Sequence, residues 1–270
     1  MHRLYRQLEI LRFSVLCIGI FFGLLSHAGE EPDPEDLAEK KIVYVEPSNI
    51  STTAVNGEYL LIPYRDRRPR WGSTASIGFS NYEPTHYDPN FTSATYGQTY
   101  SQPTVPLLEL QVTVKRNLSF GSVGGEIAIG QYQNGHSDPN VTHSTLSLTP
   151  WRIGAVYAFD NYSGEPYVVP YVSGGLYSMI YKEVLNDSAN GGATGNSLNG
   201  SSQVAPYFNF GGMFTLDWID RRAARGAYKD SGIESSYLFL EGRTYVKSSN
   251  ARDHDFSNPL SLGGGVRVEF

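Results

Sequence analysis

Charged side chains recur at alternate positions inside apolar stretches of this 270-residue chain. Between residues 108 and 115, Leu or Val at every second position alternates with Glu109, Gln111, Thr113 and Lys115. Because alternate side chains of an extended strand point to opposite faces, such a stretch has one apolar and one polar face. Charges enclosed by other strands must pair, since an isolated buried charge is very costly. We therefore predict interior ion pairs, and the candidate residues are Glu109, Glu126, Arg152, Glu241, Arg243, Arg267 and Glu269.

Histidines and their neighbours are the other candidates for chemistry. After residue 28 the histidines are His86, His136, His143 and His254, and all four fall in predicted loops. His136 and His143 each precede a serine, and Asp253-His254-Asp255 places a histidine between two carboxylates. Short loop patterns of this kind arise easily by chance and lack the spacing of metal ligands. We expect no catalytic residue, no metal and no cofactor.

The last eleven residues, 260–270, form the clearest strand. Leu, Gly, Val and Phe occupy every even position from Leu260 to Phe270, whereas Arg267 and Glu269 stand at odd positions. One face of this strand is therefore apolar and the other carries two charges.

Seven further segments alternate in a similar way, and each could cross a bilayer as a tilted strand of roughly 9–11 residues. The apolar phase changes at Pro150, which predicts a bulge there. The segment 167–182 is apolar on both faces, so its orientation stays open. Together the eight segments predict an all-β protein, an eight-stranded antiparallel up-and-down transmembrane β-barrel. The segments are 71–82, 106–116, 119–132, 144–159, 167–182, the stretch from Phe208 to Trp218, 233–246 and 260–270.

The connections and the rim residues give the barrel a direction. Connections after odd-numbered segments are mostly longer than the others, and transmembrane barrels have long extracellular loops and short periplasmic turns. Aromatic residues at the predicted periplasmic strand ends, Trp71, Phe159, Trp218 and Phe270, are typical of a membrane girdle. Basic residues gather on the same side. There they either interact favourably with an anionic lipid leaflet or simply keep the turns soluble. They are Arg65, Arg67, Arg68, Arg70, Lys115, Arg116, Arg221, Arg222, Arg225 and Lys229.

The N-terminal residues have the pattern of an export signal. Basic residues precede an apolar run at 13–25, and Ser26-His27-Ala28 offers a small-residue cleavage site. Residues 1–28 are thus predicted to be a signal peptide, which carries the only cysteine, Cys17. Residues 29–70 are predicted to be a periplasmic extension, disordered in part, in which 42–64 could form a hairpin, cling to the barrel mouth or raise the strand number to ten. Residues 71–270 are predicted to form the barrel.

A family resemblance supports this interpretation. Pro170-Tyr-Val-Ser-Gly-Gly-Leu-Tyr177 is similar to a segment of OmpW-like small barrels, and the terminal Phe270 resembles the end of bacterial outer-membrane strands. The chain therefore resembles the OmpA/OmpW-like superfamily of small barrels over about 71–270. The resemblance implies the fold, a bacterial outer-membrane location, and recognition of the Phe270 end by the barrel assembly machinery. It implies no ligand.

Function is less determined than fold. The interior of an eight-stranded barrel is just wide enough for side chains to fill it, so ion pairs could close it. This predicts an outer-membrane protein with a structural or surface-interaction role and long polar extracellular loops. The alternatives are a narrow pore or solute-binding barrel, and a soluble secreted β-sandwich. The formal net charge is −6, so the chain lacks the basic character typical of nucleic-acid binding. The expected partners are membrane lipids.

Overall fold

The computed structural model describes residues 63–90, 95–100, 103–135, 143–186 and 197–270. All of them belong to one compact unit, Gly57–Phe270. The predicted signal peptide, residues 29–62 of the predicted extension and His136 lie outside the described residues.

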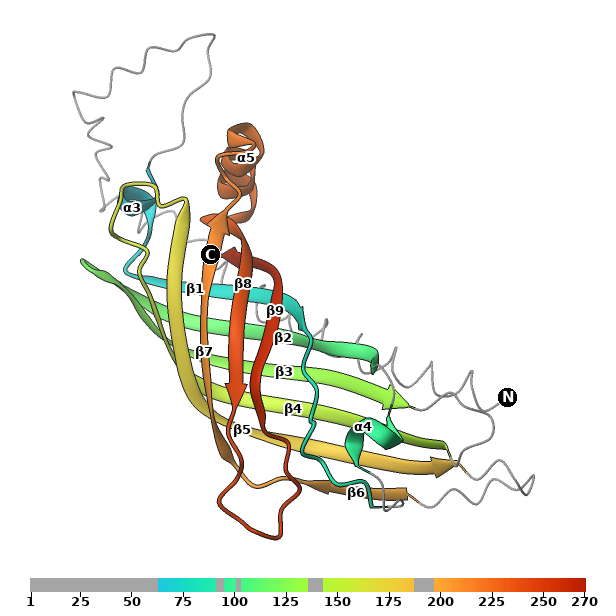
Figure 1. The fold of residues 1–270 in the computed structure, drawn as a ribbon. Coiled ribbons are helices and arrows are strands. Elements are labelled where there is room, and N and C mark those ends of the chain that lie inside the picture. Colours follow the sequence, from blue (N-terminus) through green and yellow to red (C-terminus); the bar gives the residue numbers. More distant parts are fainter. Residues whose placement is uncertain (1–62, 91–94, 101–102, 136–142, 187–196) are drawn as a thin grey trace, which may run out of the picture. The chain divides into compact units, whose positions relative to one another are not determined.

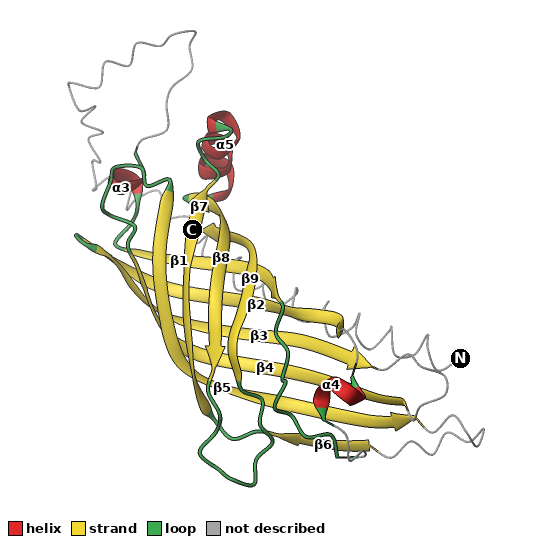
Figure 2. Cartoon of the chain, in the orientation of Figure 1, coloured by secondary structure: helices red, strands yellow, loops and turns green. Residues whose placement is uncertain are grey.

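Eight antiparallel strands close into a barrel, as the sequence predicted (Figures 1 and 2). Each strand pairs with the next one along the chain, and the pairing of β1 with β9 completes the closure. A short strand, β6 (Ser197–Ser201), extends the sheet beside the far part of β5. The eight barrel strands are β1 (Trp71–Ser80), β2 (Pro103–Leu118), β3 (Gly121–Gly135), β4 (His143–Ala158), β5 (Val168–Asn186), β7 (Ala205–Thr215), β8 (Ser235–Tyr245) and β9 (Asn258–Glu269).

The two barrel ends differ. The turn end carries the connections 119–120, 159–167 and 216–234 together with Phe270, and the loop end carries the connections 81–102 and 246–257. Two helices lie at the turn end, α3 (Tyr64–Arg67) and α5 (Arg221–Ser231), and α4 (Tyr96–Thr99) lies at the loop end. No helix in the described part of the chain is long and apolar enough to cross a membrane.

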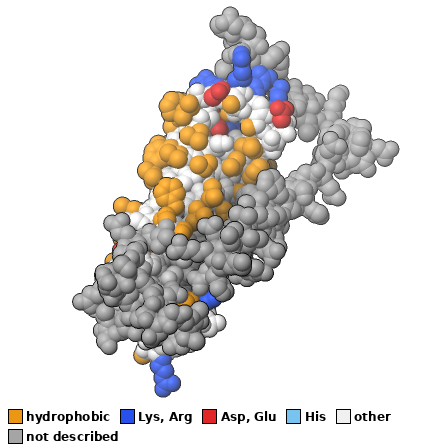
Figure 3. Space-filling view, turned by 90° about the vertical axis from the view of Figure 1, so that its right-hand side faces the viewer, with side chains coloured by type: hydrophobic (Ala, Val, Ile, Leu, Met, Phe, Trp, Pro, Cys, Tyr) orange, Lys and Arg blue, Asp and Glu red, His pale blue; other side chains and the backbone are white. Residues whose placement is uncertain are grey.

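The outer wall is apolar because the predicted alternation holds around the barrel. In β2, Leu108 and Val114 are exposed outside while Glu109 and Lys115 are buried inside. In β5, whose orientation the sequence left open, odd-numbered residues such as Tyr171 and Tyr177 point inward. The large apolar side chains that remain exposed lie mostly on the outer face, and Figure 3 shows them gathered over one side of the barrel wall.

The prediction of a bulge at Pro150 is wrong. The register of β4 against β5 runs without a shift from His143 to Ala158, with Pro150 opposite Met179. Leu146, Leu148 and Pro150 all point inward with Arg152. The apolar phase changes because the interior changes from apolar near the loop end to charged at the barrel centre, and the backbone alternation continues unbroken.

Candidate functional site

The centre of the barrel interior holds an ion-pair cluster of three carboxylates and two guanidinium groups. Arg152 donates from Nε to Glu109 Oε1 at 3.0 Å, and its Nη1 lies 3.4 Å from Glu126 Oε1. Arg243 pairs with Glu109 through Nη1 and with Glu241 through Nη2. All five side chains are at most 8% exposed. We call Glu109, Glu126, Arg152, Glu241 and Arg243 the central network.

Neutral side chains complete the hydrogen bonding of these carboxylates. Glu126 accepts from Gln111 Nε2 at 2.7 Å, Ser173 Oγ at 3.0 Å and the Tyr207 hydroxyl at 2.6 Å. The approach of Tyr207 needs a glycine, since a Cβ at Gly154 would lie 2.3 Å from its hydroxyl oxygen. Glu241 accepts from Tyr171 and Asn209, so each buried carboxylate has several donors. Such satisfaction is what a buried charge requires.

Arg267 is buried inside the barrel but does not join the central network. Its guanidinium stacks over the rings of Tyr171 and Phe239, with centroid distances of 5.0 and 5.2 Å. Its Nη1 lies 3.2 Å from Met213 Sδ. Among the described residues no carboxylate forms a salt bridge with Arg267. Arg267 lies on the polar face of the period-2 pattern, and the pattern could not specify which partner it meets.

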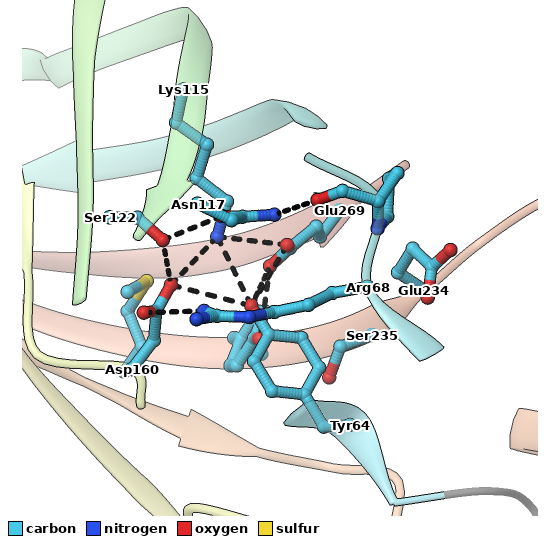
Figure 4. Close-up of polar contacts among 12 residues, drawn as sticks. Tyr64, Arg68, Lys115, Asn117, Ser122, Asp160, Glu234, Ser235 and Glu269 are labelled. Carbon is cyan, nitrogen blue, oxygen red and sulfur yellow. Dashed lines mark hydrogen bonds and ion pairs between the residues drawn. The ribbon is translucent and has the colours of Figure 1, made fainter. Parts of the chain in front are cut away.

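Glu269 belongs to a second cluster, at the turn end (Figure 4). Lys115 Nζ lies 2.8 Å from Glu269 Oε1 and 3.1 Å from Asp160 Oδ2. The Tyr64 hydroxyl donates to Glu269 Oε1 at 2.9 Å, and Tyr64 is 4% exposed. The segment Pro63–Arg70, which includes α3, thus inserts a tyrosine into the barrel mouth; we call it the turn-end plug.

Two arginines fasten the turn-end plug to the rim. Arg68 Nη1 pairs with Asp160 at 2.8 Å, and its Nη2 donates to the Leu118 carbonyl oxygen at 2.8 Å. Arg67 pairs with Asp217 at 3.1 Å and lies 3.6 Å from a carboxylate oxygen of Glu234. The plug therefore connects the β2–β3, β4–β5 and β7–β8 turns, which are distant in sequence.

Electrostatics at the turn end follow from burial and from these cations. Burial, together with Tyr237 and Glu269 nearby, raises the pKa of the Tyr64 hydroxyl well above its usual range. Burial opposes ionisation of Asp160, but Lys115, Ser122 and Arg68 outweigh it and lower the pKa of that carboxyl. Burial also raises the pKa of Glu234 to about 7, although Arg67 acts against the shift. The Tyr64 hydroxyl is therefore a neutral hydrogen-bond donor.

The loop end of the interior is filled by aromatic and aliphatic side chains. Tyr82 packs edge-on against Tyr132 and Tyr245, at centroid distances of 5.8 and 5.2 Å. The members of this tyrosine layer are Tyr82, Tyr87, Tyr96, Tyr100, Leu107, Tyr132, Leu146, Leu148, Tyr177, Met179, Ala205, Tyr207, Tyr245 and Phe256.

Glu183 holds the first loop onto the tyrosine layer. Its carboxylate is fully buried and accepts hydrogen bonds from the hydroxyls of Tyr87, Tyr100 and Ser144 and from both nitrogens of Asn90. The strand predicted at 167–182 ended one residue before Glu183, so this role was missed from the sequence. Its odd-numbered position, in phase with Tyr177 and Met179, was the available signal.

Two described histidines, His86 and His254, line one loop-end pocket together with Asp88, Asp253 and Asp255. His254 lies among Tyr87, Tyr181 and Phe256. Asp253 accepts from Gln203 and Ser248, and Asp255 pairs with Lys247 at 3.0 Å. Among the described residues no group of three or more His, Cys, Asp or Glu side chains could hold a metal ion.

The four rim aromatics all lie at the turn end. Trp71, Phe159 and Trp218 are 60%, 46% and 53% exposed. Phe270 is half-buried, and it exchanges backbone hydrogen bonds of 2.8 and 3.0 Å with Ser73, which extends the β1–β9 ladder to the last residue. An exposed aromatic rim below an apolar band is typical of a membrane-spanning barrel.

Comparisons with solved structures find several bacterial surface and outer-membrane proteins. The chain resembles small eight-stranded outer-membrane β-barrels. One similar structure is that of Ail, the attachment invasion locus protein of Yersinia pestis, in complex with the heparin analogue sucrose octasulfate. It is 12% identical to this chain, with a TM-score of 0.41, and the match covers 74% of this chain and 97% of Ail. The outer membrane protein OprG from Pseudomonas aeruginosa is 11% identical, with a TM-score of 0.45 and coverages of 74% and 95%.

A third similar structure is Neisserial surface protein A, which is 12% identical, with a TM-score of 0.38 and coverages of 75% and 98%. No protein-family model matches the sequence. A search of curated proteins also finds no match. The assignment of the fold therefore rests on the strand pairing described above.

Proposed function

We propose that this protein is a closed barrel of the bacterial outer membrane, with a structural or surface-interaction role. The outer apolar band and the closed strand ladder support a place in lipid, since a closed barrel leaves no unpaired backbone edge. Residues 1–28 would direct export, and the Phe270 end would be recognised by the barrel assembly machinery. The turn end would face the periplasm and the loop end the outside.

The filled interior carries the proposal of a closed rather than a conducting barrel. The tyrosine layer, the central network and the turn-end plug occupy successive levels between the two ends. A cavity beside the central network, lined by Ser76, Glu109 and Phe239 among others, has a volume of only about 10 Å³. That is room for about one water molecule. A second small cavity, beside Tyr64 and Arg67, has about 20 Å³.

Conductance in a planar lipid bilayer tests closure. The protein would be expressed with its own N-terminal segment, purified from membranes in detergent, and checked for folding by its heat-modifiable gel shift. We expect the native protein to be electrically silent, and Tyr64→Ala to remain silent because two further levels stay filled. Steady discrete channels from the native protein would support the alternative, a narrow pore or solute-binding transport barrel.

Labelling of intact cells tests the surface role. Lys182 and Lys247 are exposed near the loop end, whereas Lys229 is exposed at the turn end. A membrane-impermeant amine reagent should modify the first two and spare Lys229. Labelling of Lys229 alone would reverse the proposed orientation, and full extraction without detergent would favour a soluble protein. The proposal assigns no catalytic role to Asp253, His254 or Asp255.

A further inference from the structure

The turn end carries a basic helix that the barrel itself does not need. Helix α5 (Arg221–Ser231) interrupts the β7–β8 connection, where a short turn would suffice. Asp220 caps its first turn by accepting from the backbone nitrogens of Arg222 and Ala223, at 3.0 and 2.9 Å. Gly232 ends it with a positive φ of 64°. Because both ends are capped, the sequence specifies where this helix begins and where it ends.

The cations of α5 share one face. With 3.6 residues per turn, Arg221, Arg222, Arg225 and Lys229 fall within an arc of about 100°. Ala223, Ala224 and Ala227 fall on the opposite side. None of the residues of α5 is buried, and Arg221 and Lys229 are exposed. The helix is therefore amphipathic through its charge, while its apolar face is too small to insert deeply into a bilayer.

The position of α5 matches the level of lipid headgroups. Trp218 and Ile219, 53% and 64% exposed, stand immediately before its cap. Trp218 packs edge-on against exposed Tyr167 at 6.2 Å. Aromatic residues of this kind mark the boundary between hydrocarbon and headgroups. In Figure 3, Lys and Arg side chains gather beyond the hydrophobic band at the end where α5 lies.

Further cations border the same rim. Arg70 and Arg116 are exposed there, and the Arg116 guanidinium lies 6.0 Å from the centre of the Trp71 ring. Lys115, by contrast, points inward and forms ion pairs with Glu269 and Asp160. The basic character of this rim therefore comes from Arg70, Arg116 and the α5 face.

We infer that α5 docks on anionic phospholipid headgroups of the leaflet at the turn end, which fixes the β7–β8 connection against the membrane surface. This inference rests on the proposed membrane-embedded function. Charge complementarity selects the partner, since the exposed cations Arg221, Lys229, Arg70 and Arg116 stand at the level of the lipid phosphates. The small apolar face makes the contact electrostatic and therefore sensitive to salt.

Native mass spectrometry with added lipid tests the inference on the full-length protein expressed with its own N-terminal segment. The detergent-purified protein is titrated with phosphatidylglycerol or with phosphatidylcholine of the same acyl chains. A basic residue near an anionic surface is worth about 1 kcal/mol, or about a fivefold change in affinity. The double variant Arg221→Gln/Lys229→Gln should therefore bind phosphatidylglycerol about 25-fold more weakly than the native protein, with phosphatidylcholine binding unchanged.

A matched control removes the same charge at the other end. Lys182→Gln/Arg252→Gln, both exposed near the loop end, should leave the phosphatidylglycerol preference intact. Equal binding of the two lipids by the native protein, or equal losses in both double variants, would overturn the inference. Retention of the native protein on purified peptidoglycan without a lipid preference would assign α5 to the cell wall instead. A failed proposed function would show separately, as a protein that needs no detergent and has no heat-modifiable band.

Discussion

Arg152 is the residue whose removal tests the central network most directly. Its side chain is 1% exposed, and it bridges Glu109 and Glu126 while lying over the Tyr207 ring at 4.8 Å. Arg152→Met keeps much of the side-chain volume and removes the charge. Glu109 would then depend on Arg243 alone, and Glu126 would lose its only cationic partner among the described residues.

The expected loss follows from what each carboxylate keeps. Removing one member of a buried pair costs roughly 3–5 kcal/mol. Glu126 keeps three hydrogen bonds and Glu109 keeps Arg243. We therefore expect Arg152→Met to lower the free energy of unfolding by about 3 kcal/mol, the low end of this range. Glu126→Gln should cost less, about 1–2 kcal/mol, because Arg152 still pairs with Glu109.

Urea unfolding in phospholipid vesicles, followed by the heat-modifiable band, measures both losses. The combined Arg152→Met/Glu126→Gln variant removes one charge of each sign, so its loss should be smaller than the sum by about 1 kcal/mol or more. Val172→Ala, on the outer face of β5, is the control for a change away from the network. A loss below about 1 kcal/mol for Arg152→Met, or strict additivity in the double variant, would refute the argument that the network holds the barrel closed.

Two predictions concern the barrel ends. The pKa of Glu234 is raised from 4.5 to about 7, so between these pH values the folded protein binds more protons than the unfolded chain and its stability falls as pH rises. Glu234→Gln should flatten this fall when the free energy of urea unfolding is measured at a series of pH values. An unchanged slope of that free energy against pH would contradict the assignment. Glu183→Ala removes the acceptor of five hydrogen bonds, so limited proteolysis within 83–100 should speed up about tenfold or more while the barrel band persists. An unchanged cleavage rate would show that Glu183 does not anchor the loop.

The sequence predicted the barrel because a period of two is a local property. Alternate apolar residues identify the outer face of each strand, and the charges between them then lie inside, as Glu126 and Arg243 do. The pattern fails near the loop end, where both faces are apolar. There Leu146 and Leu148 face the tyrosine layer, so the sequence showed an apparent phase change at Pro150 without any change in the strand.

The turn-end plug could not be predicted from spacing. Tyr64 meets Glu269 across 205 positions and Asp160 across 96 positions, and no local pattern relates such residues. Charge alone was misleading as well, since Lys115 belongs to a basic stretch but points into the barrel. Only the closed ladder brings β9, β2 and the β4–β5 turn together around one tyrosine.

The three filled levels differ in how they could open. The tyrosine layer combines ring packing with hydroxyl hydrogen bonds, such as those of Tyr87 and Tyr100 to Glu183, whereas the central network is a set of mutually dependent charges. The turn-end plug belongs to a segment outside the strands, and its displacement leaves the β-ladder intact. Displacing the plug would nevertheless uncover Lys115 and Glu269 still paired with each other, above an intact central network. A closed barrel of this design needs at least two coordinated changes before ions can pass, which is why loss of Tyr64 alone should leave the membrane silent.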